Sequence, residues 1–120
     1  MAQEDFVAQL KELGYQPEPL PEGRVAFPYL VPCGKFAGQQ IRLGFAIPPD
    51  FSLSSPSGPH MSPRLLPLNP VQGEHPLAGV HTSPFGDEWE YWSRPMPNWS
   101  STSKKVRDVM AHVRRLFDTQ

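Results

Sequence analysis

The chain has 120 residues, and its 11 basic and 12 acidic side chains leave a formal net charge of only −1 at pH 7. This length supports one domain, residues 1–120, built around a single core. The near balance of charge gives no strong positive field, which argues against nucleic acid or a membrane surface as a partner. Proline is unusually common, at 16 of 120 residues against an ordinary share of ~5 %. Many ordered turns and few long elements are therefore expected.

A single cysteine, Cys33, rules out an intrachain disulfide and fits a reducing compartment. The first ten residues lack the apolar stretch of a signal peptide, and no run reaches the ~18 apolar residues of a membrane span. The sequence therefore predicts a cytoplasmic protein.

Residues 2–13 predict a short amphipathic helix, because their apolar positions follow the spacing of one helical face. Gly14 is a natural stop for that helix. The proline-rich stretch 15–23 predicts a non-helical connector. The apolar positions of the helix are Phe6, Val7, Leu10 and Leu13.

Two strands are expected next, at 24–31 and 39–47, with a turn at Cys33–Lys35 between them. Pro28 interrupts the first strand, which indicates a sheet edge or a bulge. The proline-rich passage that follows leaves room only for a short strand, at Arg64–Leu68.

Residues 101–118 give the clearest helical pattern, with apolar residues at intervals of three and four. The serines and threonine of Ser100–Ser103 are candidate N-caps for it. The order of helix, meander, extended stretch and helix predicts an α+β fold, with the helices packed on one antiparallel sheet. The apolar positions of this second helix are Val106, Val109, Met110, Val113, Leu116 and Phe117.

Between the extended stretch and the second helix, residues 75–99 hold all three tryptophans and show almost no regular period. A solvated tail would not carry this much aromatic surface. We expect an ordered, irregular loop that is packed by its own aromatic rings and presents polar groups.

The order of these parts resembles the ubiquitin-conjugating (UBC) superfamily, and in particular its prokaryotic branch found beside bacterial ubiquitin-like genes. That family has an N-terminal helix, a β-meander, a proline-rich passage, a His-Pro-Asn motif, a long loop, a Trp and a helix. Here residues 47–59, IPPDFSLSSPSGP, resemble the proline-rich passage, and His75-Pro76 match the first two motif positions. Trp99 and residues 100–117 resemble the Trp and the following helix. Further likeness to the bacterial branch lies in PPDF (48–51), PHMSP (59–63) and YWSR (91–94).

The departures from the family concern its chemistry. Leu77 stands where the family has the Asn that steadies the developing oxyanion, and an isobutyl group cannot do this. The family's thioester cysteine falls in the region Ser83–Gly86 here, where there is no thiol. Cys33 lies far earlier in the chain, and Ser83 would be a poor nucleophile without an adjacent base.

The resemblance therefore implies a UBC-like protein without the usual catalytic cysteine. Such a pseudoenzyme would bind a ubiquitin-like protein, or its adenylating activating enzyme, and would need no cofactor. Two alternatives stay open. One is an active conjugating enzyme that uses Cys33 or a loop site at His75 and His81, and the other is a structural subunit of an assembly.

The candidate site residues follow from these alternatives. Cys33 is either a small half-buried residue or a relocated nucleophile. His75 and His81 are either acid/base groups or loop histidines bound to backbone, and the absence of a clear third ligand argues against a metal site. If the protein is active, the catalytic candidates are Cys33, His75, His81 and Ser83. The residues expected to bind a partner are Trp89, Trp92, Ser93, Arg94, Phe51 and His60.

Overall fold

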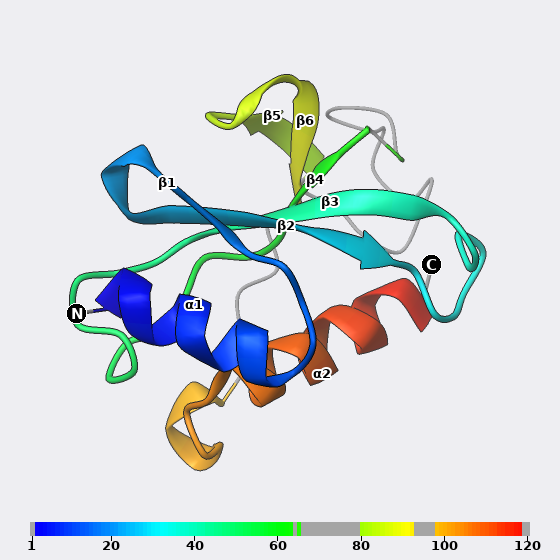
Figure 1. The fold of residues 1–120 in the computed structure, drawn as a ribbon. Helices are drawn as coiled ribbons and strands as arrows, with labels where there is room; N and C mark the ends of the chain where they lie inside the picture. Colours follow the sequence, from blue (N-terminus) through cyan, green and yellow to red (C-terminus); the bar gives the residue numbers. More distant parts are fainter. Residues whose placement is uncertain (1, 64, 66–79, 93–97, 119–120) are drawn as a thin grey trace.

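A computed structural model of the protein describes residues 2–63, 65, 80–92 and 98–118, with residues 80–82 described by their backbone. Two helices lie on one side of an antiparallel sheet (Figure 1), so the predicted α+β class is confirmed. The helices are α1 (Ala2–Glu12) and α2 (Val106–Asp118), and short 3-10 turns occur at Pro21–Gly23 and Trp99–Ser101. The strands are β1 (Glu18–Leu20), β2 (Arg24–Leu30), β3 (Gln40–Ala46), β4 (His60–Ser62), β5 (Val80–Ser83) and β6 (Gly86–Trp92).

The strands pair in the order β1-β2-β3-β4-β6-β5, and every pairing is antiparallel. The first four follow one another as a meander, of which the sequence predicted the two strands β2 and β3. The last two form a hairpin in which β6, and not β5, lies beside β4.

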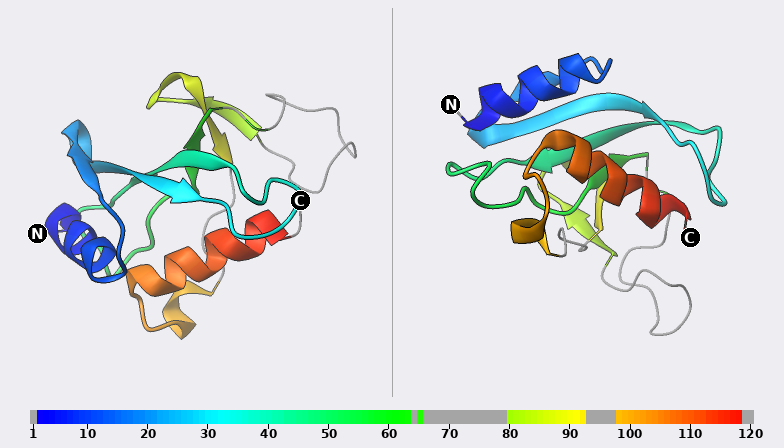
Figure 2. Two further views of the ribbon diagram at one scale, coloured as in Figure 1. Left: turned by 45° about the vertical axis from the view of Figure 1, so that its right-hand side comes forward. Right: turned by 90° about the horizontal axis from the view of Figure 1, so that it is seen from below.

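The hydrophobic core lies between the two helices and the face of the sheet that they cover (Figure 2). Phe6 of α1 packs against Phe45 of β3, with ring centroids 5.7 Å apart. Phe117 of α2 packs against Trp92 of β6 at 5.2 Å. These contacts join the first and last elements of the chain to the middle of the sheet.

The N-terminal helix was predicted correctly, and it ends at a left-handed glycine. Phe6 and Leu10 are buried. Gly14 has φ of +95°, and the amide of Tyr15 donates to the carbonyl of Leu10 at 3.1 Å, which satisfies a carbonyl at the helix end. Leu13 is instead exposed, because it follows the last helical residue.

The connector 15–23 is not free of regular structure, which the sequence did not predict, because β1 lies within it. β1 pairs with β2 only as far as Ala26. Beyond that point β2 has β3 on one side and no described strand on the other. Pro28 lies in this unpaired part, where its missing N–H removes no ladder hydrogen bond, so the predicted edge position is confirmed.

The second helix begins at Val106, later than the predicted residue 101. The predicted caps in Ser100–Ser103 are not those of α2. The amide of Val106 donates to Oε1 of Gln9 at 2.9 Å, and the amide of Lys105 donates to the carboxylate of Asp108 at 3.0 Å. A side chain of α1 therefore caps α2. Within the described ranges, no helix is both long and apolar enough to cross a membrane.

The stretch 75–99 is not one irregular loop, and that prediction was wrong. Residues 80–92 form the β5–β6 hairpin, which turns at Pro84 and Phe85. The short strand expected at Arg64–Leu68 falls almost wholly outside the described residues, and the strand in this part of the sheet is β4.

Candidate functional site

Three of the residues that the sequence singled out, His60, Ser83 and Trp89, meet on the face of the sheet opposite the helices. His60 of β4 lies in one cross-strand row with Gly44 of β3 and Tyr91 of β6, and residues paired in this way share a face. Nδ1 of His60 lies 2.7 Å from Oγ of Ser83, at the end of β5. The register therefore brings a predicted binding residue against a predicted catalytic candidate.

Aromatic rings pack around this pair on the side of the sheet where the hairpin turns. The ring of His60 lies between those of Phe85 and Tyr91, at centroid distances of 4.6 and 4.5 Å. Phe85 also packs on Trp89 at 4.9 Å. We call His60, Ser83, Phe85, Trp89 and Tyr91 the hairpin cluster.

A glycine in the sheet makes room for this cluster. A Cβ at Gly44 would lie 2.5 Å from the ring of Phe85. Any larger residue there would push the ring away from the sheet, so Gly44 allows the turn of the hairpin to fold over the strands. The presence of this glycine in β3 thus decides how closely the cluster packs.

Burial determines the charge of His60, of which only 4 % is exposed. Loss of solvent, aided by the nearby positive charge of Arg24, lowers the pKa of His60 from 6.5 to about 4. The imidazole is therefore neutral at neutral pH, as expected for a buried group that would otherwise carry an unpaired charge.

The neutral ring lets Ser83 donate its hydroxyl proton to Nδ1, while the amide of Phe85 donates to Oγ of Ser83 at 3.1 Å. The hydroxyl is thus held from two sides. A general base works best when its pKa is near the operating pH, and a pKa of about 4 is far below that. The geometry is that of a nucleophile and a base, but the base is too weak to activate the hydroxyl well.

Two arginines from the central strands flank the cluster. The guanidinium of Arg24 lies 5.7 Å from the centre of the Phe85 ring, and that of Arg42 lies 5.6 Å from the Trp89 ring. Arg42 also pairs with Glu18 at 3.4 Å. Cation–π contacts of this kind are worth about 0.5–1 kcal/mol at exposed sites, so they help to hold the hairpin on the sheet.

On the opposite face of β6, Glu90 is fully buried. Its Oε1 accepts hydrogen bonds from the amide of Leu65 at 2.8 Å and from the indole N–H of Trp92 at 3.0 Å. A buried carboxylate with such partners fixes the strand and the tryptophan that follows. Trp92 belongs to the main core, and only 1 % of it is exposed. The expectation that Trp92 binds a partner therefore stays a prediction, and its buried ring does not support it.

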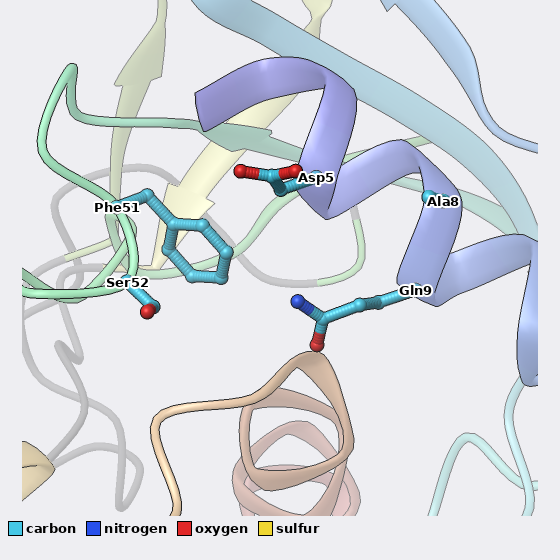
Figure 3. A pocket seen from close by; sticks show the side chains of 5 residues that line it. All are labelled: Asp5, Ala8, Gln9, Phe51 and Ser52. Carbon is cyan, nitrogen blue, oxygen red and sulfur yellow. The ribbon is translucent and has the colours of Figure 1, made fainter. Parts of the chain in front are cut away.

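Phe51 lies at a different place, beside a hollow of about 180 Å³ between α1 and the loop after β3. Figure 3 shows the amide of Gln9 between this hollow and the start of α2, with Asp5 and Ser52 on the other walls. Phe51 is buried and packs on Trp99, whose indole N–H donates to the carbonyl of Ser52 at 3.0 Å. Trp99 is thus part of the core, and Phe51 anchors the loop.

Cys33 is half-buried in the loop between β2 and β3, where its thiol donates to the carbonyl of Arg114 at 3.5 Å. The following residue, Gly34, lies against the last turn of α2, so that a Cβ there would be 1.8 Å from the carbonyl oxygen of Phe117. Cys33 therefore contacts α2, whereas Ser83 contacts β4 and the hairpin turn.

Several candidates lie outside the described residues or are described only in part. His75, Ser93 and Arg94 are outside them. The backbone of His81 lies in β5, opposite Tyr91. The roles expected for these residues stay predictions.

Sequence reasoning missed two polar residues of this region. Glu90 was not selected, although its position between Trp89 and Tyr91-Trp92 hints that it is buried. Gln9 was not selected either, because no local pattern indicates that it caps a helix almost a hundred residues later.

Among the residues that the structure describes, no group of three His, Cys, Asp or Glu side chains could hold a metal ion. Comparison of the chain with protein-family models, with curated proteins and with solved structures gave no match. The class of protein is therefore argued from the chain itself.

Proposed function

We propose that this protein is a UBC-like scaffold that binds a ubiquitin-like protein, or its adenylating activating enzyme, without forming a covalent intermediate. The order of its elements supports the proposal: α1 is followed by β1–β3, a proline-rich passage over residues 47–59, β4, the β5–β6 hairpin and α2. The motifs quoted from the sequence supply the partner class. Fold alone does not determine function. The choice between binding and catalysis therefore rests on the surroundings of the candidate nucleophiles, Ser83 and Cys33.

The main observation is the environment of Ser83, which stands in the region where the resembled family has its thioester cysteine. Its hydroxyl is held by His60 and by the amide of Phe85. The imidazole beside it has a pKa of about 4, and a hydroxyl without an effective base is a poor nucleophile. Cys33, the single thiol of the chain, faces α2 instead. Both observations favour binding over catalysis.

Intact-mass spectrometry tests the absence of a covalent step. The protein is incubated with ATP, a bacterial ubiquitin-like protein and the corresponding activating enzyme. The expected result is no added mass on the wild type, Ser83→Ala or Cys33→Ala.

Either of two outcomes would overturn the proposal. A thiol-sensitive adduct that disappears in Cys33→Ala would identify an active conjugating enzyme with a relocated nucleophile. A hydroxylamine-sensitive adduct that disappears in Ser83→Ala would identify an oxyester-forming enzyme.

A further inference from the structure

A groove runs along the exposed side of α2, away from the hairpin cluster. Its central part has a volume of about 500 Å³ and lies between α2, the outer end of β2 and the segment after α1. Tyr29 and Met110 are its most buried walls. Its rim includes Tyr15, Leu30, Arg107 and Arg114.

Two smaller hollows extend this groove in both directions. One shares Arg107 with it and adds Leu13 and Lys105, and the other shares Arg114 and adds Arg115. The three together follow α2, whose 13 residues span about 20 Å at 1.5 Å per residue. About six residues of extended chain, at about 3.3 Å each, cover that length.

Apolar side chains stand uncovered along this path. Leu30 is 59 % exposed and Leu13 is 47 % exposed. They are two of the three large apolar side chains that are exposed in the described part of the chain, and both line this set of hollows. Isolated exposed leucines need no explanation, but leucines that border one continuous groove indicate a contact surface.

The charge of the central hollow is entirely positive. Its ionised side chains are Arg107 and Arg114, and neither forms an ion pair with a residue in the described ranges. Burial raises the pKa of Tyr29 to about 12, so that its hydroxyl stays neutral beside them. The two arginines are two helical turns apart, about 10 Å along the axis, which matches about three residues of extended chain.

The outer hollows carry charges of both signs. They add the cations Lys105 and Arg115 and the anions Glu12 and Asp118. Arg107 also acts on the neighbouring Asp108, whose pKa it lowers, but the ionised groups that line the centre of the groove are both positive. The buried tyrosine and methionine lie at the same place. Guanidinium groups in such a setting favour carboxylates, which they can bind with two parallel hydrogen bonds.

We propose that this groove binds an extended segment of a partner protein that carries acidic and apolar side chains, with its carboxylates on Arg107 and Arg114 and its apolar groups against Tyr29 and Met110 and at the rim formed by Leu30. The groove lies on α2 and not on the hairpin cluster, so it can serve such a segment whether or not the partner is a ubiquitin-like protein.

The test uses ¹⁵N-labelled full-length protein and two pools of hexapeptides as probes. Each peptide of the first pool holds two Asp or Glu and two Leu, Phe or Tyr residues, and the second pool has Lys or Arg in place of the acids. Amide shifts are followed by NMR, and the best peptide is then measured by fluorescence anisotropy. The variants are Arg114→Glu and Leu30→Ser in the groove, with Lys11→Glu as the charge-matched control on the exposed side of α1.

The acidic pool is expected to shift the amides of Leu30 and Ala111, with a Kd on the order of 10–100 µM for the best peptide. Arg114→Glu should weaken binding by about tenfold or more and Leu30→Ser by about threefold, while Lys11→Glu changes it by less than about twofold. Higher salt should weaken binding as well.

Three outcomes would each overturn the proposal. The first is no shift in the groove with the acidic pool at about 1 mM, a concentration that detects even weak association. The second is equal binding of the basic pool. The third is an equal effect of the Arg114→Glu and Lys11→Glu substitutions, which would show only a general response to net charge.

Discussion

The buried histidine of the hairpin cluster predicts a specific loss of stability on acidification. His60 takes up a proton at about pH 4 in the folded protein, whereas an unfolded histidine does so near 6.5. Below pH 6.5 the unfolded chain therefore binds a proton that the folded chain refuses, and lowering the pH favours unfolding. The stability that depends on the neutral ring is fully present above pH 6.5 and is lost as the pH falls toward 4.

The difference between these two pKa values fixes the size of the effect. Each pH unit between the two pKa values changes the free energy of unfolding by about 1.4 kcal/mol. The contribution of His60 to that free energy should therefore fall by about 2.5 kcal/mol between pH 7.5 and pH 4.5. Carboxylates also titrate in this range. For Asp108, for example, loss of solvent is the largest single influence and acts to raise the pKa. The hydrogen bonds from Ser103 and the Lys105 amide, together with the positive charges of Arg107 and Lys105, outweigh it, so the pKa of Asp108 is lowered.

A difference measurement removes these other groups. Urea unfolding of the wild type and of His60→Gln is followed by tryptophan fluorescence at several values of pH between 4.5 and 7.5. The wild type should be the more stable protein at pH 7.5, and its advantage should shrink by about 2.5 kcal/mol at pH 4.5. An advantage that stays constant over this range would refute the burial argument. NMR titration of the histidine ring protons gives the same pKa directly, since the resonance missing in His60→Gln identifies it.

Three further predictions concern packing and capping. Gly34→Ala should lower the free energy of unfolding by more than about 2 kcal/mol, because its Cβ would meet a backbone carbonyl of α2 and its φ is +79°. Gly38 has a similar φ but open space around it, so Gly38→Ala should lower the free energy of unfolding by about 1 kcal/mol. Glu90→Ala should cost about 2–4 kcal/mol, because two N–H donors lose their buried acceptor, while the exposed Glu88→Ala should change stability by less than about 0.5 kcal/mol. Gln9→Ala should cost about 1 kcal/mol through the lost cap of α2.

Thermal and urea unfolding measure all of these differences. Equal effects of the Gly34 and Gly38 substitutions would contradict the contact with α2. A neutral Glu90→Ala would show that its two donors find other acceptors. An unchanged stability in Gln9→Ala would mean that α2 does not depend on a cap from α1.

The parts of the fold that the sequence predicted correctly are those in which one face is buried and the other is not. The spacing of Phe6 and Leu10 identified α1, and the alternation of Ile41, Leu43 and Phe45 identified β3. In both elements the buried residues recur at the period of the element, so a local pattern was enough.

Strand β6 of the hairpin escaped prediction because both faces of its second half are covered. Trp89, Glu90 and Trp92 are all buried although neighbours in a strand point to opposite faces. Such a strand shows no alternation of apolar and polar residues. The start of α2 was misplaced for a different reason: its cap comes from Gln9, and tertiary contacts of this kind leave no local signal.

The candidate site was predictable by residue but not by arrangement. His60 and Ser83 were both selected, yet their contact depends on the pairing of β4 with β6 and of β6 with β5. The spacing of residues in the sequence does not reveal the register in which β4, β6 and β5 pair. It also does not reveal the role of Gly44, whose missing side chain admits the ring of Phe85.

The most direct test of the proposed function is isothermal titration of the full-length protein without ATP, in separate runs with a bacterial ubiquitin-like protein and with its activating enzyme. The proposal predicts saturable heat in at least one of these runs, with a Kd in the range of about 1–100 µM and an unchanged affinity in the Ser83→Ala variant. Absence of any heat in both runs at high micromolar concentration, with all proteins folded, would contradict it.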